Sequence, residues 1–453
     1  MNVELPRSDT DELHRQATQK VMRHLLPMMI GIYFLSFIDR TNVALAKTAF
    51  EAQLGISPAV YGFGAGVFYL AYALLEVPSN LLAYRVGPRL WIARIAVTWG
   101  ALSAAMMFVQ GEWSFIALRV LLGIAEAGLF PALMYVTTLW WAQKDRTVAV
   151  GWIYTAPAIG LIVGNALGGA LLQLDGLGGL QGWQWMFLLE GLPTVLFGVF
   201  LFFTFPDRPS EASWLTAREA EVLERSAAGG AASHYSHDPH TPSKEWLSAL
   251  KRPTTILMGL VYFLNQVGFV GLYFFVPSMV QQMHVTSPFI IGLLSSTVGI
   301  GFLLGILILP HLHRHVTNDF VFLGGVTTGL VLSSALFMLA PSPSVQLALF
   351  VATAFFAGGI LPSYWSVSMK RLHGIQAAAG LAFINTIGLI GGFVGPYLFG
   401  LVERQTGSSA SGFGIILLTA VLGLALIPLL ARAFRSEPAE PGVVEAEAPA
   451  LEP

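Results

Sequence analysis

Four ionisable side chains interrupt two apolar stretches of the sequence. Asp39 and Arg40 stand side by side in one stretch, and Arg119 and Glu126 stand seven residues apart in another. A carboxyl group can carry a proton, and a guanidinium can bind an incoming carboxylate through two parallel hydrogen bonds. Charged groups inside a bilayer are costly and mark functional sites. The four residues therefore predict proton and carboxylate chemistry, provided that the apolar stretches cross a membrane.

The composition predicts a membrane protein. The chain has 453 residues, of which 55% are hydrophobic and 11% are charged, whereas a soluble globular domain carries about 25% charged residues. Apolar stretches of about 20 residues, the length that crosses a bilayer as a helix, recur along the whole sequence. We predict twelve such spans, near residues 24–46, 58–83, 90–110, 114–140, 147–172, 184–205, 254–280, 287–310, 319–340, 344–368, 375–402 and 411–433.

The basic residues predict the orientation of these spans. Lys and Arg gather in alternate loops and near both ends of the chain, whereas the opposite loops hold only Lys47 and Arg404. Because basic loops stay on the cytoplasmic side, we expect both termini to be cytoplasmic. No cleavable signal peptide is expected, since the first span is too long for one. Cysteine is absent, so the sequence excludes disulfides, thiol nucleophiles and Cys-based metal sites.

The spans divide into two related halves. Ser57 and Ser287, each followed by Pro, open the second and eighth spans, and the fifth and eleventh spans are both rich in Gly. Such correspondence is typical of transporters built from structural repeats. We predict a cytoplasmic N-terminal segment, an N-terminal six-helix half, a cytoplasmic linker, a C-terminal six-helix half and a disordered cytoplasmic tail, at 1–23, 24–205, 206–252, 253–434 and 435–453.

The predicted linker contains a helix start signal. Thr216 and Glu219 have the spacing of a capping box, which predicts a short amphipathic helix from this point. His234, His237 and His240 further along the linker have the spacing of a metal-binding tract, but a solvated linker is the favoured interpretation. We expect neither a metal nor a cofactor.

Helical geometry predicts that the four ionisable residues lie close together. At 1.5 Å per residue, Asp39 lies about 22 Å from the start of the first span, level with Arg119 in a core about 30 Å thick. Glu126 follows Arg119 by nearly two turns on the same face. We expect Asp39 to pair with Arg40 and Arg119 until Arg40 turns to an incoming carboxylate. Glu126, with no Arg beside it in sequence, is the better proton carrier at rest.

These expectations assign proton coupling to Asp39 and Glu126 and substrate binding to Arg40 and Arg119. The alternative is a static buried salt bridge. Glu76 and Glu190, the other carboxyl groups within spans, have structural and functional interpretations of equal weight.

The C-terminal half must contribute neutral polar groups. The interiors of its six spans contain no Asp, Glu, Lys or Arg, whereas hydroxyl, amide and indole groups can bind an oxygenated anion. Tyr72 in the second span joins this predicted substrate-binding set, whose members in the C-terminal half are Asn265, Gln266, Tyr273, Ser363, Tyr364, Trp365, Ser366, Asn385 and Thr386.

Four segments resemble the signatures of a known family. They are FIDRTN at 37–42, YALLEVPSN at 72–80, RVLLGIAEAGLFP at 119–131 and WMFLLEG at 185–191. Together they resemble the anion:cation symporter branch of the major facilitator superfamily. The resemblance implies an all-α integral membrane fold of twelve helices in two six-helix halves.

The resemblance also implies a function. It points to a transporter of an organic anion, such as a sugar acid, a hydroxy acid or an aromatic carboxylate, that works by proton symport with alternating access. It implies a multi-pass protein of the bacterial cytoplasmic (inner) membrane and makes Arg40, Tyr72, Trp365 and Asn385 the likelier substrate contacts. Tyr84 stands where many members of the superfamily carry Asp, so the gating-loop pairing of the family is not transferred to this chain.

Other functions stay open at this point. An organic-anion exchanger or uniporter fits the same residues, and a polytopic membrane sensor or enzyme is a more remote alternative. His311, His313 and His315 form the one His cluster near a membrane face, and their spacing, with Arg314 among them, fits a basic loop better than a metal site. We expect a monomer that binds a small organic anion and protons in the lipid bilayer, with no nucleic-acid partner.

Overall fold

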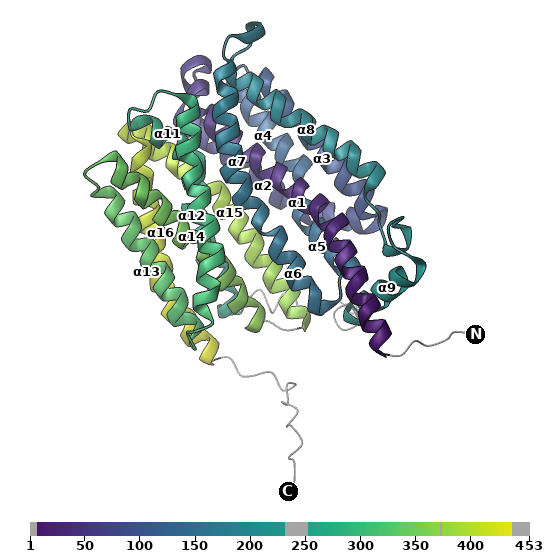
Figure 1. Ribbon diagram of the computed structural model, residues 1–453. Helices are drawn as coiled ribbons and strands as arrows, with labels where there is room; N and C mark the ends of the chain where they lie inside the picture. Colours follow the sequence, from purple (N-terminus) through teal and green to yellow (C-terminus); the bar gives the residue numbers. More distant parts are fainter. Residues whose placement is uncertain (1–6, 232–251, 372–373, 437–453) are drawn as a thin grey trace.

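The computed structural model describes residues 7–231, 252–371 and 374–436, and in this part of the chain the regular secondary structure is helical (Figure 1). Twelve stretches of it are long and apolar enough to cross a membrane. The α-helices are α1 (Arg7–Leu54), α2 (Pro58–Val86), α3 (Pro88–Ala105), α4 (Glu112–Glu126), α5 (Leu129–Trp140), α6 (Gln143–Ile153), α7 (Thr155–Leu171), α8 (Gly182–Thr204), α9 (Ala217–Ala231), α11 (Pro253–Gln282), α12 (Pro288–His313), α13 (Asp319–Met338), α14 (Pro343–Arg371), α15 (Gly374–Thr406) and α16 (Phe413–Ser436).

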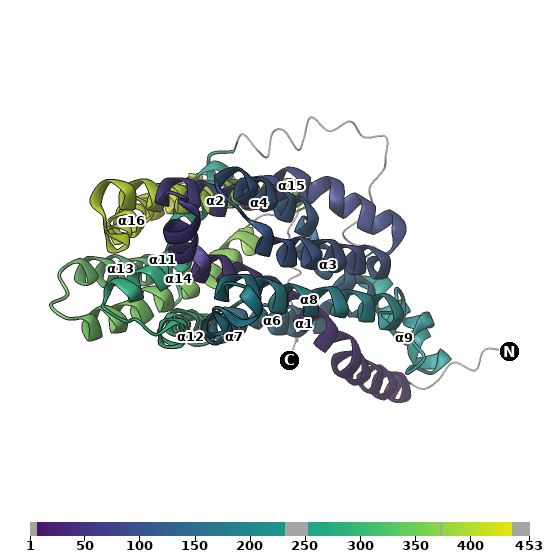
Figure 2. The same ribbon diagram turned by 90° about the horizontal axis from the view of Figure 1, so that it is seen from above.

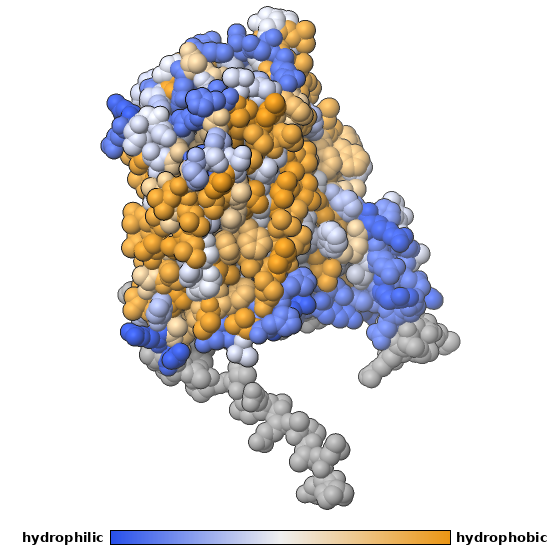
Figure 3. Space-filling view, turned by 60° about the vertical axis from the view of Figure 1, so that its left-hand side comes forward, coloured by the Kyte–Doolittle hydropathy of each residue, from blue (hydrophilic) through white to orange (hydrophobic). Residues whose placement is uncertain are grey.

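The helices form two groups that lie side by side. In Figure 2, α11, α12, α13, α14 and α16 lie on the left, and α1, α3, α8 and α9 lie on the right. α2 and α15 run along the upper edge of this view and pack against each other. The face shown in Figure 3 carries a broad hydrophobic band between polar ends. The predicted all-α fold with twelve spans is confirmed, and the band has the form expected of a surface in contact with lipid.

The first helix is longer than the predicted first span. α1 continues without a break from Arg7 to Leu54, although the prediction placed its start at residue 24. Its first turns pack against α9 and α6. Lys20 Nζ lies 2.8 Å from Glu219 of α9, and His14 Nε2 lies 2.9 Å from Asp145 of α6. Partners outside the membrane, rather than lipid, therefore stabilise the polar start of α1.

The predicted capping box at the start of α9 is confirmed. The backbone N–H of Glu219 donates to Thr216 Oγ1 at 3.3 Å, and the backbone N–H of Thr216 donates to Glu219 Oε2 at 2.8 Å. Burial would raise the pKa of Glu219, but the hydrogen bonds from Lys20 and Thr216 outweigh it and hold that pKa below its ordinary value of 4.5. The ionised carboxylate therefore joins α9 to α1. The His residues at 234, 237 and 240 lie outside the described residues.

The two halves touch most closely at the end of the bundle opposite the two chain termini, which we call the distal end. There α2 packs against α15, and α7 packs against α12. A side chain at Gly62 would overlap the backbone carbonyl of Pro396, and one at Gly169 would overlap Pro288 and Gly292. The Gly residues of these spans thus allow the backbones of opposite halves to come into direct contact.

A buried ion pair joins the halves at the distal end. Lys47 is 0% exposed, and its Nζ lies 2.8 Å from Glu403 Oε2 of α15 and 2.8 Å from Glu51 Oε1 of α1. Ser409 donates a further hydrogen bond to Glu403. The sequence analysis placed Lys47 in a loop. That placement was wrong, because α1 extends eight residues beyond the predicted end at residue 46 and carries Lys47 into the contact between the halves.

The capping box yields a pH-dependent prediction. Glu219→Gln should destabilise the protein at pH 7 by about 1 kcal/mol, because it removes the charge that holds Thr216 and Lys20. The folded pKa of Glu219 is lowered, so its contribution is present above the ordinary value and is lost as the pH falls through the folded pKa. The difference in melting temperature between the two proteins should therefore shrink in acid. Glu221→Gln, at an exposed position of α9, is the control, and a difference independent of pH would contradict the prediction.

The distal ion pair yields a stability prediction. Lys47→Met should lower the free energy of unfolding by about 3 kcal/mol, because it leaves the Glu403 carboxylate buried without a cation. Glu51→Gln is the matched control, since Glu51 is partly exposed and Lys47 keeps Glu403. Thermal unfolding of the purified proteins in detergent measures both, and equal losses in the two variants would refute the importance of the cross-half pair.

Candidate functional site

The central feature of the candidate site is an ion pair between α1 and α4. Arg40 Nη2 lies 2.7 Å from Glu126 Oε1, and the two residues are 9% and 1% exposed. The guanidinium also lies over the Phe37 ring, 4.3 Å from its centroid. Arg40 Nε and Glu126 Oε2 have no hydrogen-bond partner among the described residues. The pair therefore uses one donor and one acceptor, and leaves Arg40 able to bind a second anionic group.

Glu126 lies at a break in the fourth span. α4 ends at Glu126, Gly128 adopts a left-handed conformation with φ +88°, and α5 begins at Leu129. Ser79 of α2 donates a hydrogen bond of 2.5 Å to the carbonyl of Ala127, which the break leaves without a helical partner. The sequence analysis treated residues 114–140 as one span. Gly128 and Pro131 are the signals for the break, because Gly tolerates positive φ and Pro cannot donate within a helix.

Arg119 is held in the interior rather than presented to a ligand. It is 0% exposed, and its Nε and Nη2 donate to the carbonyl oxygens of Gly64 at 3.2 Å and Ala65 at 3.1 Å, both in α2. Its guanidinium lies 4.7 Å from the centroid of Phe68, and that of Arg40 lies 5.5 Å from the same ring. Phe68 therefore interacts with both cations.

Asp39 is bound by neutral donors. Trp99 Nε1 donates to Oδ2 at 3.0 Å, Asn42 Nδ2 donates to Oδ1 at 3.1 Å, and Ser103 donates to Oδ1 as well. Three donors around one carboxyl group form a pattern that suits the ionised state.

The expected pairing of Asp39 with Arg40 was therefore wrong, and Glu126, which has no Arg beside it in sequence, is the carboxyl group that pairs with Arg40. Successive residues of an α-helix point about 100° apart, so side chains at i and i+1 do not face each other. Arg40 points toward α4, while Asp39 points toward α3. Sequence adjacency misled the prediction, and tertiary packing chose the partners.

Side-chain hydrogen bonds connect α2 with the C-terminal half near this site. The hydroxyl groups of Tyr69 in α2 and Tyr273 in α11 are bonded to each other. Asn385 Nδ2 of α15 donates to both carboxylate oxygens of Glu76 in α2, at 3.2 Å each. The structure thus brings Asn385 and Tyr273 of the predicted set against the N-terminal half, and it gives Glu76 a partner in the opposite half.

Other residues of the predicted set make contacts within the C-terminal half. Tyr364 donates its hydroxyl to the carbonyl of Met258 at 2.7 Å and stacks on Tyr262, whose ring Trp365 also meets edge-on, with centroids 5.4 Å apart. Ser363 and Thr386 donate to carbonyls of their own helices, at Gly359 and Ala382. The hydroxyl groups of Tyr364, Ser363 and Thr386 therefore all donate to backbone carbonyls in this structure.

The remaining predicted residues occupy three different settings. Tyr72 is buried in α2 beside the Phe68 ring. Gln266 of α11 packs against the Gly391 position of α15. Ser366 lies in α14, but its side chain is outside the described part of the chain.

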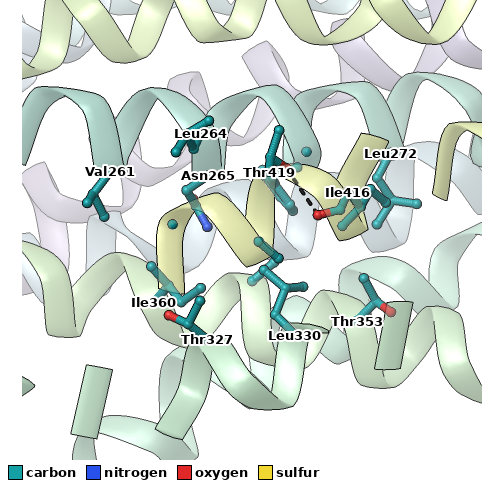
Figure 4. A pocket seen from close by; sticks show the side chains of 15 residues that line it. Val261, Leu264, Asn265, Leu272, Thr327, Leu330, Thr353, Ile360, Ile416 and Thr419 are labelled. Carbon is teal, nitrogen blue, oxygen red and sulfur yellow. Dashed lines mark hydrogen bonds between the residues drawn. The ribbon is translucent and has the colours of Figure 1, made fainter. Parts of the chain in front are cut away.

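Asn265 lines a small cavity inside the C-terminal half (Figure 4). The cavity encloses about 30 Å³ between α11, α13, α14 and α16, and its other lining residues are mostly apolar, such as Leu264, Leu330 and Ile360. A volume of this size holds about one water molecule, so an organic anion does not fit. Neither amide atom of Asn265 has a partner among the described residues. The charged residues of the N-terminal half do not line this cavity.

Several residues of the site were missed by the sequence analysis. Trp99 and Ser103 lie four residues apart in α3, and that spacing places an indole N–H and a hydroxyl on one helix face. This pair is the signal that could have identified the binding partners of Asp39. Phe68 and Ser79 gave no comparable signal, because an aromatic ring or a Ser in a membrane helix is common.

No group of three metal-ligating side chains is present among the described residues. In the His cluster at the end of α12, His313 Nε2 lies 2.9 Å from Asp319 Oδ1, and the His313 ring stacks on Phe322. These contacts give His313 a packing role between α12 and α13.

Comparison with known proteins gives consistent results. A sequence profile described as Major Facilitator Superfamily matches residues 29–396. A putative tartrate transporter of Agrobacterium vitis is 36% identical over 92% of both chains. A quinolone resistance transporter of Acinetobacter baumannii is 34% identical over 92% of this chain and 95% of its own. The inner membrane transport protein RhmT of Escherichia coli K12 is 33% identical over 89% of this chain and 92% of its own.

A solved structure shares the fold. The bacterial homologue of the human lysosomal transporter Spinster, in an inward-facing and occupied conformation, superimposes with a TM-score of 0.72 over 92% of this chain and 98% of that chain. Its sequence is 19% identical, so the likeness concerns the arrangement of helices alone.

The geometry of Arg119 predicts that its guanidinium cannot be replaced by an ammonium. Arg119→Lys should lower the free energy of unfolding by about 2 kcal/mol, because one point charge cannot bond both carbonyls of α2 from this position. Arg404→Lys, at an exposed position of α15, is the control and should unfold as the unaltered protein does. Equal melting temperatures for the two variants would show that the fork of Arg119 is dispensable.

Proposed function

The chain belongs to the Major Facilitator Superfamily, and from this premise we propose that it is a secondary active transporter that imports a small organic anion by proton symport with alternating access. It is a multi-pass membrane transporter rather than an enzyme. Relatives named as putative tartrate transporters, at 36% and 35% identity, support an organic acid as substrate. We propose the cytoplasmic membrane of a bacterium as its location and a monomer as its working form.

One observation carries the proposal: the buried ion pair of Arg40 and Glu126 is incomplete. Arg40 keeps an unpartnered Nε, and Glu126 keeps an unpartnered Oε2. A guanidinium that binds one oxygen of an internal carboxylate can exchange it for the two oxygens of a substrate carboxylate. A fully bonded pair would instead support a static structural role.

The exchange of partners couples substrate to protons. When a substrate carboxylate binds Arg40, Glu126 loses its cation and becomes a buried, unpaired carboxylate, which is costly in an apolar setting. Glu126 relieves that cost by taking one proton from solvent, so one negative charge and one proton enter the site together. When the substrate leaves Arg40, Glu126 releases its proton to solvent and forms the ion pair with Arg40 again. Asp39, held by Trp99, Asn42 and Ser103, is the second proposed proton site.

The C-terminal half is proposed to recognise the rest of the substrate. Asn385 is occupied by Glu76 in this conformation, and the amide can turn to a substrate hydroxyl or carboxylate when the halves move. Tyr72 and Trp365 are the proposed aromatic contacts, with Tyr364, Ser366 and Gln266 as neighbouring polar groups. Asn265 is the weakest member of this set, because it lines the small interior cavity.

The distal contacts support alternating access. Three polar contacts join the halves. Lys47 pairs with Glu403, the Tyr61 hydroxyl donates to the Phe274 carbonyl, and the Tyr69 hydroxyl bonds that of Tyr273. These bonds close the distal end, and they must break if the substrate is to enter from that side. Rocking of the two halves about the Gly-rich contacts of α2 with α15 and α7 with α12 would break and restore them.

An exchanger or a uniporter of organic anions is the alternative function. Counterflow of labelled tartrate in the absence of a pH gradient occurs in all three cases, whereas uptake against a concentration gradient driven by an inward proton gradient occurs only in a symporter. A panel of sugar acids, hydroxy acids and aromatic carboxylates tested by thermal shift selects the substrate if tartrate does not bind.

The coupling model predicts separable losses. In proteoliposomes, Asp39→Asn and Glu126→Gln should each abolish tartrate uptake driven by a proton gradient. Counterflow of tartrate should persist in both variants, because Arg40 remains. Arg40→Lys should reduce both, since an ammonium cannot bind a carboxylate in the bidentate manner.

A lumenal pH indicator gives the second measurement. Substrate uptake by the unaltered protein should acidify the vesicle lumen, and uptake by either carboxyl variant should not. Glu112→Gln, at the exposed start of α4, is the matched control and should behave as the unaltered protein does. Lumenal acidification by Asp39→Asn or Glu126→Gln would remove that residue from the coupling mechanism.

A further inference from the structure

One arginine of the third span has no acidic partner. Arg94 follows Pro88, the first residue of α3, by six positions, which is about 9 Å along a helix. Its side chain is partly exposed, and its Nε has no hydrogen-bond partner among the described residues. No carboxylate in this part of the chain forms an ion pair with its guanidinium. A cation inside a span is costly unless an anion neutralises it.

Arg94 lies on the outer face of α3. The exposed residues of this helix recur at spacings of three and four, which puts them on one stripe: Leu90, Arg94, Thr98 and Ala101. Trp99, which donates to Asp39, lies on the buried face. α3 packs against α2, α4, α5 and α8 of its own half, and Figure 2 shows it on the side away from α11 to α14. The stripe therefore faces lipid rather than the contact between the halves.

Trp91 holds the guanidinium in place. The Arg94 Cζ atom lies over the Trp91 ring, 4.0 Å from its centroid. Trp91 Nε1 donates to Ser79 Oγ of α2 at 3.0 Å, so a second helix fixes the ring. The N–H groups of a guanidinium lie in its plane, so stacking on a ring leaves them available to acceptors. Arg94 is thus oriented but not occupied.

The surrounding charge favours an anion. Arg85 and Arg89 are exposed at the adjoining ends of α2 and α3. α3 contains no Asp or Glu. The Asp207 carboxylate near these ends binds Arg89, whose backbone N–H donates to it at 2.7 Å and whose Nε lies 3.6 Å from it. The surface therefore carries an excess of positive charge and offers no carboxylate to an ammonium group.

We propose that Arg94 and Trp91 form a binding site for the phosphate group of an anionic phospholipid. The lipid comes from the leaflet next to the chain termini, because α3 begins at that end of the bundle. The guanidinium donates to the phosphate oxygens, and an acyl chain lies along the exposed stripe toward Ala101. An anionic phospholipid supplies the negative charge and the apolar chain in one molecule.

Native mass spectrometry of the purified, delipidated full chain tests the site with phosphatidylglycerol. Arg94→Gln should weaken binding of the first lipid about tenfold, because charged hydrogen bonds to the phosphate are lost. Arg435→Gln is the matched control, since Arg435 is exposed in the last turn of α16, at the same end of the bundle. It should bind the lipid as the unaltered protein does. Equal affinities of Arg94→Gln and the unaltered protein would overturn the proposal.

A conservative variant separates loss of charge from loss of fold. Arg94→Lys keeps the positive charge and should retain most of the binding that Arg94→Gln loses. Addition of phosphatidylglycerol should raise the melting temperature of the unaltered protein and of Arg94→Lys more than that of Arg94→Gln. A lipid-dependent shift of the same size in all three proteins would contradict a role for the Arg94 charge.

Two competitors identify the source of the phosphate. Phosphatidylcholine should bind more weakly than phosphatidylglycerol, because its own cation neutralises the phosphate and finds no carboxylate here. Inorganic phosphate should not displace the lipid, because it gains nothing from the apolar stripe. Displacement by inorganic phosphate would assign the site to a soluble anion, and equal affinities for the two lipids would refute the preference for an anionic headgroup.

Photocrosslinking locates the bound lipid. Phosphatidylglycerol with a photoactivatable acyl chain should label peptides of α3 in the unaltered protein, and Arg94→Gln should reduce that labelling. Labelling confined to other helices would overturn the assignment of the site. These measurements require no substrate and no transport, so their outcome is independent of the proton-symport assays.

Discussion

The ion pair between Arg40 and Glu126 is the interaction on which the candidate site depends. Both groups are buried. Arg40 Nη2 donates to Glu126 Oε1, whereas Arg40 Nε and Glu126 Oε2 have no partner among the described residues. In an apolar interior a charge must be balanced locally, because solvent cannot screen it. Any anion that binds Arg40 therefore changes the charge balance of Glu126. In the proposed mechanism, this single constraint connects carboxylate binding to proton binding without a long-range pathway.

The backbone of the N-terminal half is arranged around this pair. The break after Glu126 places its carboxyl group at the end of α4, and Ser79 satisfies the carbonyl of Ala127 that the break exposes. Arg119 donates to two carbonyls of α2, and the Phe68 ring lies near both guanidinium groups. Arg119 thus has a fixed position, while Arg40 is the cation that we propose changes partners.

The contacts between the halves have a different character. Close glycine packing and the buried Lys47–Glu403 pair hold the distal end together, whereas Glu76 and Asn385 meet between α2 and α15 nearer the chain termini. Such polar bonds between rigid bundles are specific in geometry, and they can be exchanged for other partners when the bundles rotate. In the proposed rocking motion, apolar packing within each half would keep the helices of that half together.

The sequence by itself determined the fold class and the residue types of the site. Apolar length fixed the twelve spans, and the cost of intramembrane charge singled out Asp39, Arg40, Arg119 and Glu126, because both are local properties of the chain. Only the tertiary structure decided the partners. The helical rotation of 100° per residue separates Asp39 from Arg40. Two of the three donors to Asp39, Trp99 and Ser103, come from α3, 60 and 64 residues away in sequence. Which side chains meet depends on helix rotation and packing, and no local pattern encodes those.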